Sequence, residues 1–238
     1  MPTAAIIPAA GSGVRFGETK QFKLLGKTPL FIHTLTPFLH SKEIEEIILV
    51  VPQDNVNNVK NSLSSLHKNK NIMVISGGPH RQDSVYRGLK KVSQSCNKVC
   101  IHDGARPFVS IELIESTIKG CVNFDGVIVA ENVTDTVKLA KHGLRVQKTL
   151  DRNNIWLAQT PQTFNKKKLV NALLSARRKN IIGTDEAMIM EEKGYSIGIV
   201  ESSNRNIKIT TKEDWRYAEL LMKVPSSQKN PQNPPITE

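Results

Sequence analysis

The sequence predicts an α/β fold with a mainly parallel sheet and one projecting β-arm. Short apolar runs alternate with longer amphipathic stretches over the first 130 residues, which is typical of parallel strands joined by helical crossovers. Beyond about residue 130 this alternation gives way to β-rich segments around a turn. A chain of 238 residues can bury a sizeable core, and we expect one domain over residues 1–223.

Five apolar runs of strand length are expected to build the sheet, at residues 4–7, 47–51, 72–75, 99–101 and 127–130. Between the first two runs, Thr28 and Pro29 favour a helix start, because threonine can cap a helix and proline suits its first turn. Pro37 is then expected to limit or kink this helix, since proline cannot donate the backbone hydrogen bond of a helix interior.

The predicted β-arm covers about residues 131–152, with a hairpin turn at His142 and Gly143. A projecting hairpin can pack against a partner chain or cover the edge of its own sheet, and the sequence leaves both roles open. The chain then returns to the body with two helices, a strand and a β-type segment, expected over residues 166–178, 185–193, 197–200 and 206–210.

The C-terminal residues divide into a last helix and a tail. Thr211 and Asp214 have the spacing of a capping box, which predicts a helix start at this point. Residues 224–238 are rich in proline and nearly free of apolar side chains, so burial cannot offset the entropy of ordering them. We therefore expect a disordered tail.

The composition excludes some classes of protein. No apolar stretch approaches the roughly 20 residues that a membrane-spanning helix needs, and the first strand begins too early for a signal segment. Three cysteines without a CxxC pair or a histidine cluster argue against disulfides and zinc, and are typical of buried thiols in a reducing compartment. We expect a cytoplasmic protein without a membrane partner.

The net charge of +11 indicates either an affinity for polyanions or a well-solvated basic surface. The lysines are scattered, and they lack the compact basic stretch interleaved with aromatic residues that nucleic-acid-binding proteins often show. We expect phosphorylated small molecules, rather than nucleic acid, as partners.

A glycine-rich loop, PAAGSGVRFGETK, follows the first strand. Gly11, Gly13 and Gly17 are spaced one residue wider than the dinucleotide-binding fingerprint, and no G-K-[ST] closes a Walker loop. Small residues let backbone N–H groups approach phosphate oxygens, while Arg15 and Lys20 add two cations. The loop suits a nucleoside triphosphate, and the alternative is a tight turn with two surface cations.

Two further segments follow predicted strands, at the sheet edge where open α/β sheets bind ligands. HDGARP places Asp103 after the fourth strand, where one carboxylate can hold Mg²⁺ that takes its other ligands from water and phosphates. The alternatives for Asp103 are a helix cap and a salt bridge with Arg106. In SGGPHRQDSVYRGL, the backbone near Gly78 can face a base, and Asp83 or Ser84 can be an N-cap.

Lys208 lies in the expected β-type segment NIKIT. Alternation puts Ile207 and Ile209 on one face of this segment and Lys208 on the other. A lysine on a buried face would be costly without an anion beside it, whereas on a solvent face it would carry no information. The pattern allows both orientations.

Taken together, these motifs resemble those of one family, the 2-C-methyl-D-erythritol 4-phosphate cytidylyltransferases of the non-mevalonate isoprenoid pathway. The resemblance covers residues 4 to about 222 and depends on PAAGSGVRFG with KQF, GGPHRQDSV, HDGARPF, VTDTVK, LDRNNIWLAQTPQTF, TDEA and NIKIT in this order. It implies a Rossmann-like nucleotidyltransferase fold, a homodimer with exchanged β-arms, and a reaction of CTP with methylerythritol phosphate that gives the CDP-alcohol and pyrophosphate.

The resemblance also implies roles for individual residues. Arg15 and Lys20 would stabilise the transition state, Arg152 and Lys208 would position the phosphate nucleophile, and Asp103 would bind Mg²⁺. The residues around CTP would be Ala9, Ala10, Gly11, Gly13, Gly78, Arg81 and Ser84. The alcohol-phosphate pocket would be lined by Arg106, Thr136, Thr160 and Thr184, with Arg106, Thr136 and Arg152 as candidates to act across the dimer.

The chain departs from the family pattern at three positions. Thr19 replaces a usual proline before the loop lysine, Asn132 stands where proline is common, and Gly104 replaces a usual alanine. These departures concern loop rigidity and arm geometry more than the chemistry. Two other functions are open from sequence: a ribitol 5-phosphate cytidylyltransferase, which would share the fold and CTP, and a non-catalytic nucleic-acid-binding or regulatory protein, which the basic charge motivates.

Overall fold

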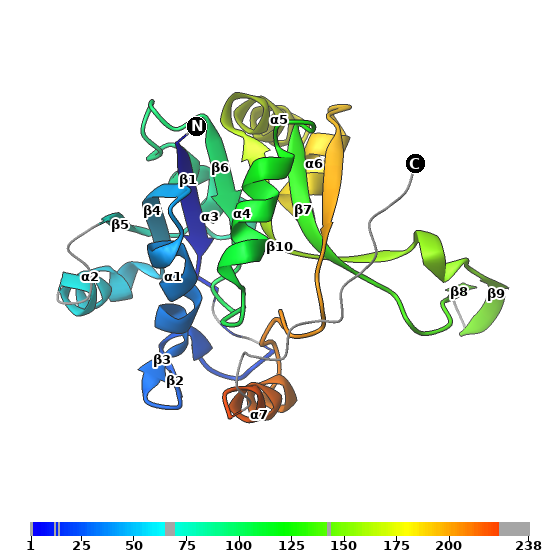
Figure 1. Cartoon of the computed structure of the whole chain (residues 1–238), viewed down its shortest axis with the longest axis horizontal. Helices are drawn as coiled ribbons and strands as arrows, with labels where there is room; N and C mark the ends of the chain where they lie inside the picture. The colour runs from blue at the N-terminus through cyan, green and yellow to red at the C-terminus, as the bar shows by residue number, and fades with distance from the viewer. Residues whose placement is uncertain (1, 12, 14, 65–69, 142–143, 224–238) are drawn as a thin grey trace.

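The computed structural model describes residues 2–11, 13, 15–64, 70–141 and 144–223. A seven-stranded sheet forms the centre, with helices on both of its faces and a two-stranded arm that extends away from it (Figure 1). The predicted turn at His142 and Gly143 and the predicted tail at 224–238 lie outside the described residues.

The central sheet is mainly parallel, with one antiparallel strand inside it. Its order is β11 (Ile197–Glu201), β7 (Gly126–Asn132), β10 (Trp156–Asn165), β6 (Lys98–Ile101), β1 (Thr3–Pro8), β4 (Ile44–Val51) and β5 (Asn71–Ser76). β10 pairs antiparallel with β6 and β7, whereas all other neighbours are parallel. The predicted α/β class and the five predicted apolar strands are confirmed, and β10 is a strand that the sequence pattern did not predict.

Helices cover both faces of the sheet, and β1 is buried on both. Ala4 and Ile6 pack on one side with α3 (Arg81–Leu89), α5 (Lys166–Arg178) and α6 (Glu186–Glu191). Ala5 and Ile7 pack on the other side with α1 (Leu30–His40), α2 (Val56–Ser64) and α4 (Ile111–Gly120). Burial on both faces explains why this strand reads as a continuous apolar run. None of the described helices is long and apolar enough to cross a membrane.

A smaller apolar cluster joins the last helix, α7 (Lys212–Leu221), to the glycine-rich loop. Phe16 packs against Trp215 with ring centres 5.6 Å apart, and Ile209 is buried in the same cluster. The predicted capping box is confirmed: the Thr211 hydroxyl accepts from the N–H of Asp214, whose carboxylate accepts from the N–H of Thr211. The last helix therefore supports the glycine-rich loop through the contact between Trp215 and Phe16.

The predicted start of the first helix was wrong. Thr28 does not cap α1, because Thr28–Pro29 forms the strand β3, which pairs with β2 (Leu24–Leu25). The helix begins at Leu30, with Pro29 as an N-cap that makes no side-chain hydrogen bond. Pro37 does not end the helix, which continues to His40.

The arm consists of β8 (Lys138–Lys141) and β9 (Arg145–Thr149), which pair with each other within the part of the chain that the structure describes. Every residue of these two strands is exposed. At the base of the arm, Leu150 donates its N–H to the carbonyl of Val137 at 2.9 Å, and the short helix η3 (Arg152–Asn154) leads into β10. Figure 1 shows the arm beyond the edge of the helical layers.

Candidate active site

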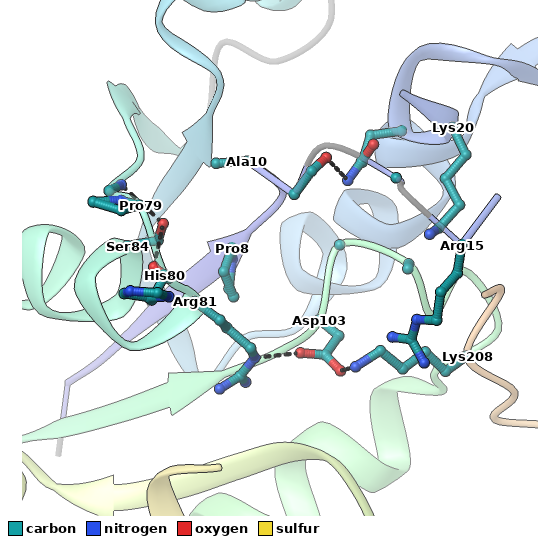
Figure 2. A pocket seen from close by; sticks show the side chains of 16 residues that line it. Pro8, Ala10, Arg15, Lys20, Pro79, His80, Arg81, Ser84, Asp103 and Lys208 are labelled. Carbon is teal, nitrogen blue, oxygen red and sulfur yellow. Dashed lines mark hydrogen bonds and ion pairs between the residues drawn. The ribbon is translucent and has the colours of Figure 1, made fainter. Parts of the chain in front are cut away.

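A cavity of about 420 Å³ opens beyond the carboxyl ends of β1, β5 and β6. Four separate stretches of chain line it: the glycine-rich loop, the loop that enters α3, the turn after β6, and Lys208 (Figure 2). The sequence-predicted residues among its lining are Ala10, Gly11, Gly13, Arg15, Lys20, Gly78, Arg81, Ser84, Asp103 and Lys208. The structure thus brings most of the predicted site together in one place.

The glycine-rich loop has a backbone conformation that requires glycine at Gly13. This residue has a φ of +70°, and a Cβ on it would lie 1.9 Å from the carbonyl oxygen of Glu18. The N–H groups of Phe16 and Gly17 donate to the Gly13 carbonyl at 2.8 and 2.9 Å. These bonds curl the loop back on itself.

Gln21 fixes the other end of the loop. Its side-chain amide donates to the carbonyl of Gly11 at 3.0 Å, and Gln21 itself lines the cavity. Gln21 belongs to the KQF motif, and the sequence pattern indicates no role for it. The contact joins the short helix η1 (Lys20–Phe22) to the start of the loop, so Lys20 is held facing the same space as the loop backbone.

Lys20 is an unusually buried lysine, with 8% of the residue exposed. Its Nζ lies 5.7 Å from the centre of the Phe16 ring. Burial, together with the positive charges of Arg15 and Lys208, lowers the pKa of Lys20. Cations gathered at this density favour the binding of a polyanion, which would relieve their mutual repulsion.

The loop that enters α3 packs closely on the glycine-rich loop. A Cβ on Gly77 would lie 2.3 Å from the Cβ of Ala10. The Ser84 hydroxyl accepts from the N–H of Gly78 at 3.0 Å and donates to the carbonyl of His80 at 3.2 Å. His80 is the N-cap of α3 and makes no side-chain capping bond, and Asp83 and Ser84 lie inside the helix. The alternative that Asp83 or Ser84 is the N-cap was therefore wrong.

Asp103 is the centre of an ion-pair network. Its Oδ1 accepts from Nε of Arg81 at 2.9 Å, and its Oδ2 lies 2.7 Å from Nζ of Lys208 and 3.9 Å from Nε of Arg106. Burial opposes ionisation of Asp103, but the charges of Arg81 and Lys208 outweigh burial and hold the pKa of this carboxyl well below its usual range. The next helix, α4, is capped by Ser110, so Asp103 is not a helix cap.

Arg81 connects Asp103 to a second buried acid, Glu186, at the start of α6. Its Nη1 donates to both carboxylate oxygens of Glu186, at 2.8 and 2.7 Å, and the Glu186 side chain is 1% exposed. Burial raises the pKa of Glu186, and the charge of Arg81 counteracts part of this rise. Sequence reasoning missed Glu186 because an acid in a first helical turn is ordinarily explained by the helix dipole.

The side chain of Lys208 points toward the carboxylate of Asp103. This decides between the two orientations of Lys208 that the alternation pattern left open. The predicted β-type segment at 206–210 was wrong, since these residues form no strand. The segment is held by the N–H of Ile209, which donates to the carbonyl of Ala105 at 2.8 Å, and by the packing of buried Ile209 and partly buried Ile207 in the cluster that contains α7. Lys208 therefore faces the opposite side, which is the cavity (Figure 2).

Three predicted residues lie beneath the cavity rather than on its lining. Ala9 belongs to the apolar core on one side of β1. Arg106 donates from Nη1 to the carbonyl of Asn206 at 2.6 Å, and the Thr160 hydroxyl accepts from the N–H of Asp103 at 3.0 Å. Each of the three is buried, and substrate contact by their side chains stays a prediction.

Three other predicted residues are exposed and lie outside the lining. Thr136 is at the base of the arm, and Arg152 in η3 donates from Nη1 to the carbonyl of Thr134 at 2.5 Å. The hydroxyl of Thr184 contacts the sulfur of Met188 at 3.7 Å. One chain does not bring these residues to the cavity, and their substrate roles stay predictions.

The described residues contain no group of three His, Cys, Asp or Glu side chains arranged to hold a metal ion. Mg²⁺ needs no such group when phosphates supply most of its ligands. Asp103 is an ionised oxygen donor at the cavity wall, and its partners Arg81 and Lys208 have side chains that are 30% and 41% exposed, which leaves them room to move. The donor set fits one Mg²⁺ held jointly with a bound phosphate.

The sheet order, the position of the cavity and its cationic lining define an α/β protein with a cationic cavity, suited to phosphorylated ligands, at the carboxyl edge of its sheet. The sequence model of the 2-C-methyl-D-erythritol 4-phosphate cytidylyltransferase family matches residues 3–224. The chain belongs to this family.

Individual relatives agree with this assignment. The 2-C-methyl-D-erythritol 4-phosphate cytidylyltransferase of Clostridioides difficile is 39% identical over 93% of this chain and 94% of its own. The enzyme of that name from Bacillus velezensis is 38% identical over 97% and 100%. The crystal structure of 4-diphosphocytidyl-2C-methyl-D-erythritol synthase from Anaerococcus prevotii superposes with a TM-score of 0.84 at 32% identity, covering 93% of this chain and 98% of that one.

Proposed function

We propose that this protein is an enzyme that joins CTP to 2-C-methyl-D-erythritol 4-phosphate. A phosphate oxygen of the alcohol phosphate attacks the α-phosphorus of CTP, and the bond from that phosphorus to the bridging oxygen of the β-phosphate breaks. The products are 4-diphosphocytidyl-2-C-methyl-D-erythritol and pyrophosphate. The family match supports this reaction, and the comparisons lend no support to the ribitol 5-phosphate alternative.

One observation of the molecule carries the proposal. Four cationic side chains, Arg15, Lys20, Arg81 and Lys208, converge from separate stretches of chain on a single cavity that one acid, Asp103, also lines. Two polyanions repel each other, so the main task of such an enzyme is to bring them together and to stabilise the charge that develops at phosphorus. A cavity of this composition is suited to that task.

The nucleophile is already anionic at neutral pH, and therefore no general base is required. In the proposed reaction the small residues around Gly11 leave backbone N–H groups accessible to CTP oxygens, whereas the N–H groups of Gly77 and Gly78 already donate to the Val51 carbonyl and the Ser84 hydroxyl. Arg15 grips oxygens with a planar fork, while Lys20 supplies a compact charge to the oxygens that become more negative in the transition state. Lys208 draws the incoming phosphate toward the α-phosphorus.

We further propose that Asp103 holds Mg²⁺ together with the phosphates of CTP. When bound, the metal would neutralise phosphate charge and fix the triphosphate conformation. For this, Arg81 and Lys208 would share or release the carboxylate oxygens that they contact at 2.9 and 2.7 Å. An Asp103→Asn enzyme should lose its Mg²⁺-dependent activity, and undiminished activity would show that this carboxylate is structural.

The exposed arm supports a further proposal, a homodimer in which each arm packs on the other protomer. Arg152 and Thr136 lie at the base of the arm and outside the cavity lining of their own chain. In a dimer with exchanged arms, these residues would reach the partner's cavity and contact the alcohol phosphate there.

We also propose that the enzyme works in the cytoplasm. Burial raises the pKa of Cys96 to about 11 and that of Cys100 to about 12. Thiols of this kind are unreactive and unpaired, as is usual for proteins of reducing compartments.

The decisive experiment measures pyrophosphate release from CTP with two alcohol phosphates in parallel. We expect turnover with methylerythritol phosphate and little with ribitol 5-phosphate. Turnover with ribitol 5-phosphate alone would overturn the substrate. No release with either, combined with salt-sensitive binding to nucleic acid, would favour the non-catalytic alternative that the charge of +11 suggested.

A further inference from the structure

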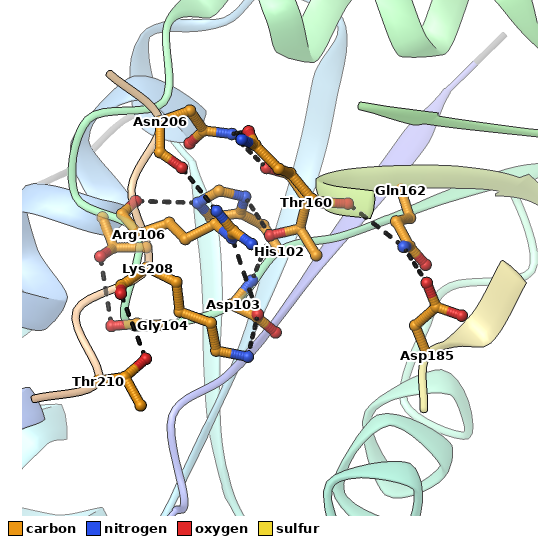
Figure 3. A network of polar contacts seen from close by, with 12 residues as sticks. His102, Asp103, Gly104, Arg106, Thr160, Gln162, Asp185, Asn206, Lys208 and Thr210 are labelled. Atoms are coloured by element: carbon orange, nitrogen blue, oxygen red, sulfur yellow. Dashed lines mark hydrogen bonds and ion pairs between the residues drawn. The ribbon is translucent and has the colours of Figure 1, made fainter. Parts of the chain in front are cut away.

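A single imidazole lies directly behind the ion-pair network of the cavity. His102 is fully buried and precedes Asp103 in the turn after β6. Its Nε2 lies 3.0 Å from the carbonyl oxygen of Arg106, and its Nδ1 lies 3.0 Å from Oγ1 of Thr160. The same Thr160 oxygen accepts from the N–H of Asp103 at 3.0 Å (Figure 3).

The proton positions follow from these contacts. A carbonyl oxygen can only accept, so Nε2 of His102 must carry the proton that it donates to Arg106. In the neutral ring Nδ1 is then an acceptor, and the hydroxyl of Thr160 donates to it. The hydroxyl oxygen keeps its lone pairs for the N–H of Asp103. The result is one continuous chain of bonds: Asp103 N–H to Thr160, Thr160 O–H to His102, and His102 N–H to Arg106.

This chain closes on the turn that presents the carboxylate of Asp103. The N–H of Arg106 also donates to the carbonyl of Asp103 at 3.0 Å, so the turn is held at both of its ends. The imidazole also packs against the ring of Phe38, with ring centres 5.1 Å apart. The ring therefore has one fixed orientation, and the backbone of Asp103 is bonded through Thr160 to β10, the antiparallel strand of the sheet.

We propose that His102 is a positioning residue, which acts through the hydroxyl of Thr160 to hold Asp103 in place at the cavity wall. In this proposal the Thr160 hydroxyl supports the backbone of Asp103 and does not contact substrate. The proposal rests on the proposed function for its kinetic consequence. We expect a kinetic consequence because a shift of about 1 Å in a catalytic group can lower the rate by a factor of roughly 100.

Two measurements on the uncomplexed protein test the bond chain without any assay of activity. Nitrogen NMR of the histidine-labelled protein should show His102 protonated at Nε2 and unprotonated at Nδ1. The N–H of Asp103 should exchange slowly with solvent in the wild type and in Thr160→Ser, and much faster in Thr160→Val. A ring protonated at Nδ1, or unchanged protection in Thr160→Val, would overturn the proposal.

Kinetics test the consequence with matched variants. His102→Asn can keep an acceptor near the position of Nδ1, whereas His102→Gln can keep only the donor toward Arg106. We expect kcat to fall roughly 10- to 100-fold in His102→Gln and in Thr160→Val, with His102→Asn and Thr160→Ser much closer to the wild type. Equal loss in both His102 variants would contradict action through Thr160.

The double variant His102→Gln with Thr160→Val separates this role from a substrate contact. Both changes break the same chain, so the second should add little to the first. If Thr160 contacted the substrate directly, the two losses would multiply, and the proposal would fail. Should the His102 variants not fold, the Thr160 pair and the NMR measurements decide the question.

Failure of the proposal is distinguishable from failure of the proposed function. If the wild-type enzyme releases no pyrophosphate from CTP and methylerythritol phosphate, the proposed function is wrong. The tautomer of His102 and the exchange rate of the Asp103 amide would still confirm or refute the bond chain.

Discussion

The cavity and the arm differ in where their order comes from. Around the cavity, polar groups are bonded to one another within a single chain: Asp103 contacts two cations within 3 Å, and Arg81 spans two carboxylates. On the arm, every residue of β8 and β9 is exposed, and in the described residues the two strands pair only with each other. An isolated two-stranded hairpin is marginally stable at best in water.

This difference separates a site that one protomer builds by itself from an arm whose proposed role depends on a second protomer. The cavity has its charges, its backbone turns and its supporting bonds in one chain, so a change there should alter chemistry or folding of the protomer itself. The arm contributes little to the protomer, so a change there should alter association. Variants on either side test this division.

The largest effect is expected for Lys20→Ala on the cavity side. Turnover at saturating CTP and alcohol phosphate should fall roughly 10²–10³-fold, by analogy with loss of one donor to a developing oxyanion. The reason is that Lys20 places its charge where negative charge grows in the transition state. Steady-state pyrophosphate release measures this effect, and a variant with near-normal turnover would refute the role.

The matched control is Lys23→Ala, one helical turn further along. Lys23 pairs with Glu18 at 2.8 Å, with both side chains substantially exposed, and it does not line the cavity. Exposed ion pairs contribute little to stability, so turnover should stay close to the wild type. A comparable loss in both variants would mean that the loop tolerates no change, rather than that Lys20 has a specific role.

A second test on the cavity side concerns the backbone of the glycine-rich loop. Gly13 and Gly17 both have positive φ, at +70° and +92°, but only at Gly13 would a Cβ meet backbone, 1.9 Å from the oxygen of Glu18. Gly17→Ala should therefore cost only the roughly 1–2 kcal/mol of the left-handed conformation, whereas Gly13→Ala should rearrange the loop and weaken CTP binding as well.

Calorimetric titration with CTP and chemical denaturation distinguish these two variants. We expect normal CTP affinity for Gly17→Ala and a clear loss for Gly13→Ala, with both proteins folded. Equal CTP affinity in the two variants would show that the position of the Gly13 backbone does not matter for nucleotide binding.

The body strands were predictable because their burial on two faces leaves continuous apolar runs, as in β1 and β4. β10 was not, because its buried residues are largely polar. Gln159, Thr160, Gln162 and Thr163 are all under 8% exposed, yet they give no apolar period. Several of their polar groups bond to partners distant in sequence, such as the side-chain amide of Gln162, which donates to Asp185 at 2.7 Å, and a single sequence does not reveal such partners.

The candidate site shows the same limit. Glycines and charged side chains directly after predicted strands marked the loop, Arg81 and Asp103 as candidates at this edge of the sheet, because the carboxyl ends of parallel strands meet there. Glu186 was missed and the orientation of Lys208 was left open, because each depends on a side-chain contact between segments about 100 residues apart. Pairing between such segments is decided by tertiary packing.

A smaller effect is expected where the last helix supports the loop. Thr211→Ala removes the hydroxyl that accepts from the N–H of Asp214 at 3.2 Å and should lower the free energy of unfolding by about 1 kcal/mol. Thr211→Ser keeps the hydroxyl and should be nearly neutral. Urea denaturation checks this pair, and an unchanged midpoint in Thr211→Ala would show that the capping box is dispensable.

The smallest effect on the protomer, and the most informative about the arm, is expected for Leu139→Glu combined with Val146→Glu. These side chains are 41% and 55% exposed, so the free energy of unfolding of the monomer should change by no more than about 0.5 kcal/mol. If the proposed exchanged-arm dimer forms, sedimentation across a range of protein concentrations should nevertheless show the variant dissociating at concentrations where the wild type is still dimeric, because two carboxylates would be buried in that interface without partners.

Val122→Glu is the matched control for the arm variant, because Val122 is 80% exposed on the body and outside the arm. It should leave association unchanged. A wild type that is monomeric at all concentrations would refute the exchanged arm. If instead the arm variant unfolded more easily as a monomer, the arm would be packing on its own chain, and the division between cavity and arm would lose its basis.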